Sequence, residues 1–523
     1  MKKKNFNLSF KIAFKTFAPK PLNFNLAPLM KKLFIITLAA LWLNKPNAVQ
    51  AQNCNCPQNF NWVVKTFTDN DAGYAYMLQK KGKETLDVLT AKLQKQASQT
   101  THTDSCQKLM AQWLHFFRGG HIGVNVNSNP SAANNNSTGK ETPAQIRKKY
   151  STEQRININY KQYTQQYNKQ NTHHPLEGIW SNGLYTVVVL QSKDTSQLLG
   201  VVLHADSIFW LPGQIKMHIS KQKLNNTYAT KYGMKDHSIE NTQLQMVGNG
   251  GNFFTTGSGG NWQRLYPVSK YTAQDSLVLL ISTPHPFVNR LSKNTMYLRI
   301  PSFNHAQKPF IDSVLQANDN AIRTSPNLII DIRNGTGGSD FSYHSIMPYL
   351  YTNPIRHTGT REYATPLNAK AYDYYATLFA DTAVKNSQLR TAAAMRKNIG
   401  KFLGSDTIHV SVDTLHQVLP NPKYVAIICN HINASADEQF IIYARQSKKV
   451  KIFGAPTAGM LDFSNLNFTN SPDGFFQLYY ATDKSYRVPT FCIDDVGIQP
   501  DVYLDESIPE HLWIKYVQAY LEN

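Results

Sequence analysis

A regular alternation of apolar strand patterns with helical patterns constrains the fold of this chain more than any other feature of its sequence. From about residue 290 the strand patterns fall at 296–301, 327–333, 424–429 and 450–453, and the helical patterns between them at 307–323 and 434–446. The runs 327–333 and 424–429 are rich in Ile, Leu and Val, which is typical of strands buried on both faces. This order predicts an α/β layered core with a partly parallel sheet.

The chain of 523 residues is too long for one ordinary core, so we expect further parts around this one. Short strands separated by turn residues predict a small all-β domain at 173–268. Helical patterns predict an N-terminal helical segment at 52–126 and, after a polar stretch, a linker and helix at 127–172. The α/β core would then occupy 269–523, where a helical stretch at 366–403 interrupts the alternation and is expected to form a lid over a cleft.

The first residues have the pattern of a targeting sequence. After Met30, two lysines precede the apolar stretch 33–43, which is too short to span a bilayer, and Val49 and Ala51 are small residues before a cleavage site. We therefore expect an export leader over 1–51, with a signal peptide from residue 30, and an exported protein in the periplasm, the outer envelope or the extracellular space. An N-terminal anchor helix is the alternative. No second long apolar run follows, so no stable membrane insertion is expected.

Composition and charge exclude several other classes. Hydrophobic residues make up 41% of the chain and charged residues 17%, which is a globular composition. The net charge is +20, but nine lysines and no acidic residue fall within 1–51, which leaves +11 on the remainder. No run of Lys or Arg with interleaved aromatic residues stands out there, so we expect no nucleic-acid partner.

The cysteines indicate a disulfide rather than a metal site. The five cysteines are Cys54, Cys56, Cys106, Cys429 and Cys492. Export permits disulfides, and Cys106 with either Cys54 or Cys56 is the candidate bridge. The sequence has no CxxC motif and no His pair at zinc-finger spacing, so no metal is expected, and no cofactor is implied.

Three turn motifs follow three of the predicted strands. In the first, 331–338 (DIRNGTGG), the glycines allow a sharp turn whose N–H groups can stabilise a developing oxyanion. In the second, 433–438 (NASADE), Ser435 begins a helix, where the helix dipole and the next N–H favour negative charge. An ordinary N-cap serine with Glu438 as its capping-box partner is the alternative there. The third motif is 454–459 (GAPTAG), which by itself is a turn.

Together, in this order and spacing, the three motifs resemble the tail-specific (C-terminal processing) peptidase family and its tricorn-core relatives over roughly residues 290–505. The resemblance implies a ClpP/crotonase-like α/β catalytic core, with an all-β middle domain and a helical N-terminal segment attached to it here. It also implies that Ser435 is the nucleophile. The oxyanion hole would be formed at Gly337, Gly338 and Ala436.

One departure from the family bears on the mechanism. The tail-specific members have a Lys general base directly after the glycine that matches Gly459, but this chain has Met460, whose thioether cannot accept a proton. The chain therefore resembles the branch that lacks this Lys and uses Ser with His and an acid. The segment 117–124 is similar to the one that supplies the base, which implies His121, although a Gly stands where an Asp is usual. The segment 492–501 is similar to the one that carries the acid, which implies Asp494, one methylene shorter than the family's Glu.

Alternatives remain for both of these residues. His121 and Asp494 can be read as turn residues, and His431, four residues before Ser435, is the main rival base. The remaining rivals are His115, His344 and His357.

The sequence thus predicts a secreted serine endopeptidase that cleaves polypeptides through an acyl-enzyme with a Ser435–His121–Asp494 triad. A non-catalytic ligand- or peptide-binding protein on the same fold is the alternative, because the Lys is missing. The sequence does not indicate the oligomeric state.

Overall fold

The computed structural model describes residues 54–127, 143–205, 208–224, 226–257, 260–379, 381–408, 410–505 and 507–523, all within one compact unit that spans Ala51–Asn523. The predicted leader and residues 128–142 of the predicted linker lie outside the described residues. None of the helices in these ranges combines the length and the apolar character needed to cross a membrane.

A six-stranded sheet forms the centre of the C-terminal core. Its strand order is β10 (Phe287–Arg290), β11 (Thr295–Arg299), β12 (Asn327–Asp331), β16 (Tyr424–Cys429), β17 (Val450–Gly454) and β20 (Val502–Tyr503). The strands from β11 to β20 are parallel, and β10 pairs with β11 in the antiparallel sense. The predicted α/β core with a partly parallel sheet is therefore confirmed.

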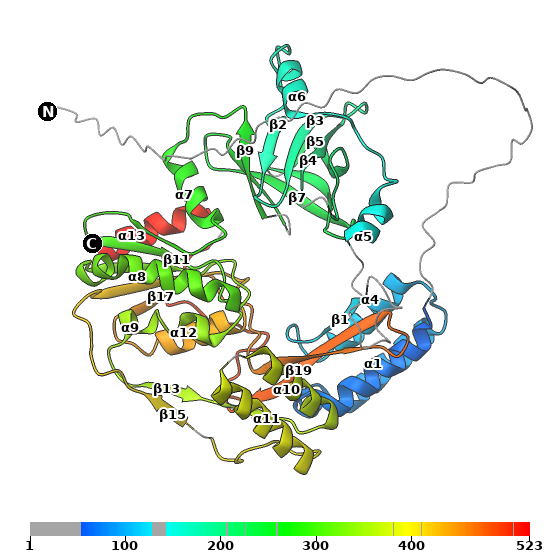
Figure 1. Ribbon diagram of the computed structural model, residues 1–523, viewed down its shortest axis with the longest axis vertical. Helices are drawn as coiled ribbons and strands as arrows, with labels where there is room; N and C mark the ends of the chain where they lie inside the picture. The colour runs from blue at the N-terminus through cyan, green and yellow to red at the C-terminus, as the bar shows by residue number, and fades with distance from the viewer. Residues whose placement is uncertain are drawn as a thin grey trace, which may run out of the picture. The chain divides into compact units, whose positions relative to one another are not determined.

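Helices cover both faces of this sheet (Figure 1). The helices of the core are α7 (Ala273–Ser282), α8 (Lys308–Thr324), α9 (Met347–Leu350), α12 (Ala436–Ala444) and α13 (Trp513–Glu522), with short 3-10 turns η2 (His305–Gln307), η3 (Asp340–Tyr343) and η4 (Glu510–Leu512). Because side chains alternate along a strand, Leu328 and Ile330 of β12 pack with α8 and α12, whereas Ile329 packs with α7 and α13. This burial on both faces explains why the strands read as continuous apolar runs.

The middle of the chain folds into a closed barrel, which confirms the predicted all-β region. Its strands are β2 (Gly178–Ser181), β3 (Thr186–Gln191), β4 (Gln197–His204), β5 (Ile215–Leu224), β6 (Thr227–Gly233), β7 (Ile239–Val247), β8 (Phe253–Thr256) and β9 (Gly260–Tyr266). Two short helices precede it, α5 (Pro143–Tyr150) and α6 (Tyr160–Tyr167). Closure leaves no free sheet edge, and buried aromatic side chains such as Trp180, Phe254 and Trp262 fill the interior.

The N-terminal helices share one core with strands from the other end of the chain. The helices are α1 (Cys56–Asn70), α2 (Tyr74–Lys81), α3 (Lys83–Ala97) and α4 (Thr103–Leu114). Their apolar faces pack against β18 (Phe463–Asn470) and β19 (Phe476–Ser485), and β1 (Gly123–Val126) pairs with β19. A disulfide joins Cys56 to Cys106, one of the two predicted pairings, and ties α1 to α4. This shared core holds the segment just before β1 against the residues that lead into β18.

The predicted helical stretch at 366–403 contains α10 (Pro366–Leu378) and α11 (Thr382–Lys397). It is anchored from α10: Tyr372 Oη donates to Asp483 in β19 at 2.8 Å, and Asn368 Nδ2 donates to the Asn70 carbonyl at 2.9 Å. Three short strands flank it, β13 (Ile355–Thr358), β14 (Thr360–Glu362) and β15 (Val410–Asp413). β13 pairs with β15, and β14 adds to β19. A lid function for this stretch stays a prediction.

Candidate active site

Two of the three turn motifs meet at one edge of the central sheet. β12 and β16 are parallel neighbours, with Asp331 opposite Ile428, so the turns that follow them emerge side by side. The carboxyl ends of parallel strands are where open α/β sheets place their ligand sites.

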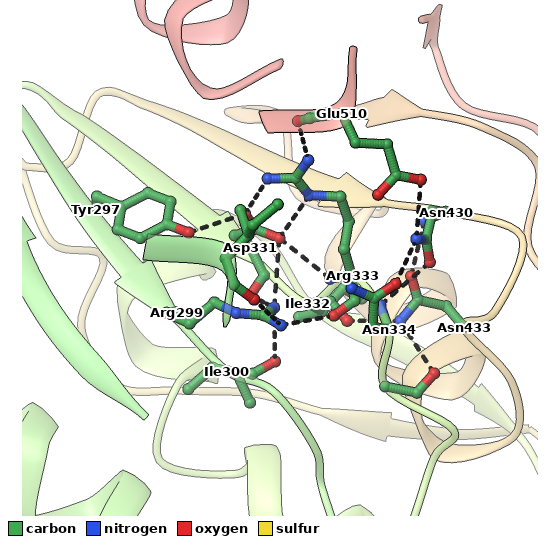
Figure 2. A network of polar contacts seen from close by, with 12 residues as sticks. Tyr297, Arg299, Ile300, Asp331, Ile332, Arg333, Asn334, Asn430, Asn433 and Glu510 are labelled. Carbon is green, nitrogen blue, oxygen red and sulfur yellow. Dashed lines mark hydrogen bonds and ion pairs between the residues drawn. The ribbon is translucent and has the colours of Figure 1, made fainter. Parts of the chain in front are cut away.

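Asparagine side chains join the two turns (Figure 2). Asn430 Oδ1 accepts the backbone N–H of Asn334 at 3.1 Å, and Asn430 Nδ2 donates to Asn334 Oδ1 at 2.8 Å. Asn433 Nδ2 donates to the Ile332 carbonyl at 2.6 Å and to Asp437 Oδ2 at 2.7 Å. The position of the glycine turn relative to Ser435 is thus set by buried amide hydrogen bonds.

A buried ion network lies beneath the glycine turn. Asp331 receives Arg333 Nη2 at 2.5 Å and the Tyr297 hydroxyl at 2.9 Å, and Arg299 Nη1 lies 3.4 Å from its other oxygen (Figure 2). Burial alone raises the pKa of Asp331, but the two guanidinium groups outweigh it and hold the pKa below its ordinary value. The polar residues of the DIR sequence therefore anchor the turn and do not face a substrate.

Ser435 has an unusual backbone conformation. Its φ is 57° and its ψ is −119°, immediately before the first residue of α12. A non-glycine residue with positive φ carries strain, and such strain persists where the surrounding structure fixes it, often at active sites. Ala436 is the first residue of the helix, so its N–H has no partner within the helix. Ser435 therefore combines a fixed backbone, a free neighbouring amide and the positive end of a helix.

The glycine turn approaches Ser435 so closely that no side chain fits. A Cβ on Gly337, whose φ is 90°, would lie 2.7 Å from Ser435 Cβ, and one on Gly338 would lie 2.3 Å from the Phe303 carbonyl carbon. Burial raises the pKa of Asp437 to about 7, and hydrogen bonds from Asn433 and from the Gly337 backbone offset part of this rise. The Ala436 amide nitrogen lies beside the same turn, 3.0 Å from where a Cβ on Gly337 would stand.

Glu438 joins the third motif to the turn that holds Ser435. Its Oε2 accepts the N–H of Ser435 at 3.1 Å and the N–H of Met460 at 2.8 Å. Its Oε1 accepts the Thr457 hydroxyl at 2.5 Å and the Gly459 N–H at 2.7 Å. The GxxTxG sequence therefore supplies two of the donors that stabilise this buried carboxylate. The N–H groups of Ser435 and Met460 donate to the same oxygen of Glu438, Oε2.

His121 lies in a left-handed turn, with φ 55°, and the turn packs against Met460, the residue after the third motif. Arg118 forms a buried ion pair with Asp71 at 2.5 Å and also donates to the Gly120 carbonyl at 3.1 Å, which fixes the turn. A Cβ on Gly120 would lie 2.2 Å from Met460 Cγ. The Met460 side chain, at the position of the family's Lys, therefore fills the space beside the His121 turn.

The imidazole of His121 is oriented by a backbone carbonyl. Its Nδ1 lies 2.5 Å from the oxygen of Phe463. A carbonyl oxygen only accepts, so Nδ1 carries the proton and Nε2 of the neutral ring carries the lone pair. Burial lowers the pKa of His121 and so favours this neutral form.

Asp494 contacts the chain that leads to Phe463. Its Oδ1 accepts the N–H groups of Leu461 and Asp462, each at 2.7 Å, and Asp462 Oδ2 in turn accepts the Asp494 N–H at 2.8 Å. Burial, together with the charge of Asp462, raises the pKa of Asp494 to about 7. The hydrogen bond made by His121 Nδ1 goes to Phe463, and Asp494 holds the two residues before Phe463.

The rival histidines lie elsewhere in the described part of the chain. His431 is exposed in the turn after β16, and His115 is exposed at the end of α4. His344 and His357 lie around a cavity beside η3. The same described part holds no cluster of three or more His, Cys, Asp or Glu placed to bind a metal ion.

Sequence reasoning missed two participants of this site. The Phe463 carbonyl has no sequence signal, because every residue carries a backbone oxygen. Glu438 was considered only as a capping residue, and its larger role follows from contacts with residues 19 to 22 positions away. The spacing between Glu438 and the threonine of the third motif is the signal that connects them.

The model of peptidase family S41 matches residues 294–504, a stretch that contains all three turns and Asp494. No curated protein matches the chain.

Several solved structures are similar to this chain at low identity. Mature CPAF complexed with lactacystin is 12% identical, with 90% of this chain and 97% of that chain covered and a TM-score of 0.43. The photosystem II D1 C-terminal processing protease is 12% identical, with 87% and 94% covered and a TM-score of 0.34. The tricorn protease is 9% identical, with 90% and 36% covered and a TM-score of 0.38. The likeness to peptidase family S41 rests on the match over residues 294–504.

Proposed function

We propose that the protein is a serine endopeptidase that hydrolyses polypeptides through an acyl-enzyme on Ser435, because the model of peptidase family S41 matches residues 294–504. One observation carries the proposal. Ser435 is held at a positive φ at the start of α12, with the Gly337 turn in contact with its Cβ region. A serine in this setting presents its hydroxyl beside free backbone amides, as acyl transfer requires.

His121 is the proposed general base. Its Nδ1–H donates to Phe463, which leaves the Nε2 lone pair to accept the proton of the Ser435 hydroxyl as Oγ attacks the peptide carbonyl. The same proton then passes to the leaving amine, and a water activated by His121 hydrolyses the ester. General base catalysis of this kind contributes about 10²–10⁴-fold in rate.

The oxyanion of the tetrahedral intermediate would be bound by the N–H groups of Gly338 and Ala436. Gly337 contributes by lacking a side chain, which lets the turn approach Ser435. Donors of this kind are each worth about 10²–10³-fold in kcat because they are already oriented when the charge develops.

In this proposal Asp494 is the acid of the Ser–His–Asp triad, and it acts on His121 indirectly, through the backbone that leads to Phe463. Its contacts to Leu461 and Asp462 hold the segment that ends in the Phe463 carbonyl, and that carbonyl fixes the His121 tautomer. In a triad with a direct carboxylate, the acid orients the imidazole and stabilises the imidazolium. Here we propose that the Phe463 carbonyl orients the imidazole of His121 and that Asp494 holds the backbone of that carbonyl in place.

Export is also part of the proposal. The leader pattern at 1–51 supports a secreted or periplasmic protein, and the Cys56–Cys106 disulfide fits an oxidising compartment. The substrates would then be polypeptides outside the cytoplasm.

The test is hydrolysis of an unfolded protein by the full chain and by its Ser435→Ala and His121→Ala variants, together with covalent labelling by a serine-reactive phosphonate. We expect labelling of Ser435 in the wild type and loss of hydrolysis in both variants. If the wild type shows no labelling and no hydrolysis above the Ser435→Ala background, the alternative of a non-catalytic peptide- or ligand-binding protein replaces this proposal.

A further inference from the structure

A cavity of about 300 Å³ lies between η3, α9, α12 and the β13–β15 ribbon. The rings of Tyr343, Tyr351 and Tyr443 form much of its wall, and the carboxylates of Asp340 and Asp413 stand among its polar groups. Concave sites with a mainly aromatic and apolar lining and a few polar groups are the usual form of a ligand site.

Two of the elements around the cavity directly follow the turns of the proposed active site. η3 begins two residues after Gly338, and Tyr443 belongs to the helix that Ser435 precedes. The ring of Tyr343 packs 5.5 Å from that of Phe440 in this helix. Tyr443 is eight residues beyond Ser435, which corresponds to roughly 12 Å along a helix axis.

That separation fits a substrate running from one site to the other. An extended chain advances about 3.3 Å per residue, so a span of roughly 12 Å corresponds to three or four residues. A side chain in this cavity would therefore belong to a residue some distance from the cleaved bond and not to the residue that carries the reacting carbonyl.

The polar groups of the cavity favour a cation. None of its described lining residues is Lys or Arg. Asp340 is exposed, but the groups packed around its carboxyl partly exclude water from it. This desolvation raises the pKa of Asp340. The Tyr343 hydroxyl is buried and makes no hydrogen bond of normal geometry within the described residues, although the Asp340 carboxylate lies close enough to raise its pKa further. The Tyr343 hydroxyl, the His344 imidazole of the lining and, from outside the lining, the Arg487 guanidinium each offset part of this rise in the pKa of Asp340.

We propose that this cavity is a subsite for a Lys or Arg side chain of the polypeptide substrate, three or four residues from the cleaved bond. The inference rests on the proposed function, because it gives the peptide its direction from Ser435. An ammonium or guanidinium group would lie against the tyrosine rings, where cation–π attraction applies, and its charge would face Asp340 and Asp413. Each carboxylate already has a neighbour: His357 Nε2 lies 2.9 Å from Asp413, and the Tyr343 hydroxyl and His344 act on Asp340.

The test separates binding from turnover. Full-length Ser435→Ala protein is immobilised and exposed to a pool of random-sequence decapeptides, and the retained peptides are sequenced. We expect Lys and Arg to be enriched roughly tenfold at one position, which corresponds to one charge-assisted contact, and the enrichment to shrink in high salt.

Two variants in the Ser435→Ala background locate the effect. Asp340→Asn together with Asp413→Asn should abolish the enrichment, and both carboxylates are exposed, so the fold should tolerate the change. Asp406→Asn is the matched control, an exposed aspartate that pairs with Arg361 away from the cavity, and it should keep the enrichment.

A pool in which no position favours Lys or Arg overturns the inference. So does an enrichment that survives the double substitution, and so does enrichment of aromatic or aliphatic residues at the position that the double substitution affects. Absence of hydrolysis by the wild type, with the enrichment intact, would contradict the catalytic proposal alone.

Discussion

His121 Nδ1 lies 2.5 Å from the carbonyl oxygen of Phe463, and this contact joins the N-terminal segment to the first residue of β18. The two residues are 342 positions apart. The contact determines which ring nitrogen carries the proton, and so it determines that Nε2 is the basic nitrogen of the proposed site.

Replacement of His121 by Ala is expected to reduce kcat by about 10²–10⁴-fold, because the Ser435 hydroxyl loses its base. The measurement is steady-state hydrolysis of an unfolded protein. His431→Ala serves as the control, since His431 is exposed in the turn after β16, and it should keep wild-type activity. Loss of activity in His431→Ala with activity retained in His121→Ala would reverse the assignment.

The pH dependence of kcat/KM should also report the titration of His121. The neutral ring is the active form of a base, and burial lowers the His121 pKa below its ordinary value of about 6.5. Activity should therefore persist as the pH falls through about 6.5 and decline only at lower pH. The check is a pH–rate profile of the free enzyme. An acid limb centred above pH 6.5 would contradict a buried neutral base.

Gly337→Ala should abolish phosphonate labelling of Ser435. The added Cβ would lie 2.7 Å from Ser435 Cβ and from the Ala434 carbonyl oxygen, so the glycine turn has to move away from Ser435. Gly251→Ala is a matched control, because Gly251 also has a positive φ, 68°, but a Cβ there meets nothing within 4 Å. That variant should lose only about 1–2 kcal/mol of stability from backbone strain and should label normally. Equal labelling of both variants would show that the close approach is not needed.

Glu438→Gln should both destabilise the protein and slow labelling of Ser435. The carboxylate accepts four hydrogen bonds, from Ser435, Thr457, Gly459 and Met460. A carboxamide offers one acceptor oxygen and turns an NH₂ toward donors, so we expect a loss of about 3 kcal/mol in the free energy of unfolding. Denaturant titration measures it, with Glu84→Gln on the exposed side of α3 as the control. An unchanged denaturation midpoint would mean that the four hydrogen bonds of Glu438 contribute little to the free energy of unfolding.

The free energy of unfolding should fall as the pH rises from about 4 to about 7, because Asp494 and Asp437 titrate over this range. Both pKa values are raised to about 7, chiefly by burial, from ordinary values near 4. In that window the folded state binds more protons than the unfolded state, so the free energy of unfolding falls with increasing pH.

Unfolding titrations at pH 5 and pH 7.5 check this expectation. Asp494→Asn removes one of the two titrating groups and should make the fall between the two pH values smaller, by an amount on the order of 1–4 kcal/mol. An Asp494→Asn protein with the same pH dependence as the wild type would contradict the raised pKa of this carboxyl.

Much of the core could be predicted because its signals are local. The apolar run at β12 predicts a strand buried on both faces, and the structure places Ile329 on one face and Leu328 on the other. The glycines at 337 and 338 predict a sharp turn, and both have positive φ values. Ser435 at the start of α12 follows from the same kind of reasoning, since capping and helix periodicity depend on neighbours within one turn.

The contacts that define the candidate site depended on the tertiary structure. Asp494 could be picked out by its place before a turn, but its hydrogen bonds to Leu461 and Asp462, and not to His121, depend on how two loops lie against each other. The role of Phe463 is carried by a backbone oxygen, which has no identity in the sequence. The same is true of the cavity beside η3, whose walls come from segments far apart in the chain.

The sequence by itself determined the alternation of strands and helices, the glycine turns and the serine at a helix start, because each depends on residues within a few positions of one another. Only the tertiary structure decided that His121 contacts the Phe463 carbonyl and that Glu438 accepts the hydrogen bonds of the third motif. It also decided that Met460 packs beside the His121 turn. Those relationships are hydrogen bonds and close contacts between residues that are brought together by the shared core of the N-terminal helices and the β18–β19 strands. Local pattern specifies elements, and packing of those elements specifies the site.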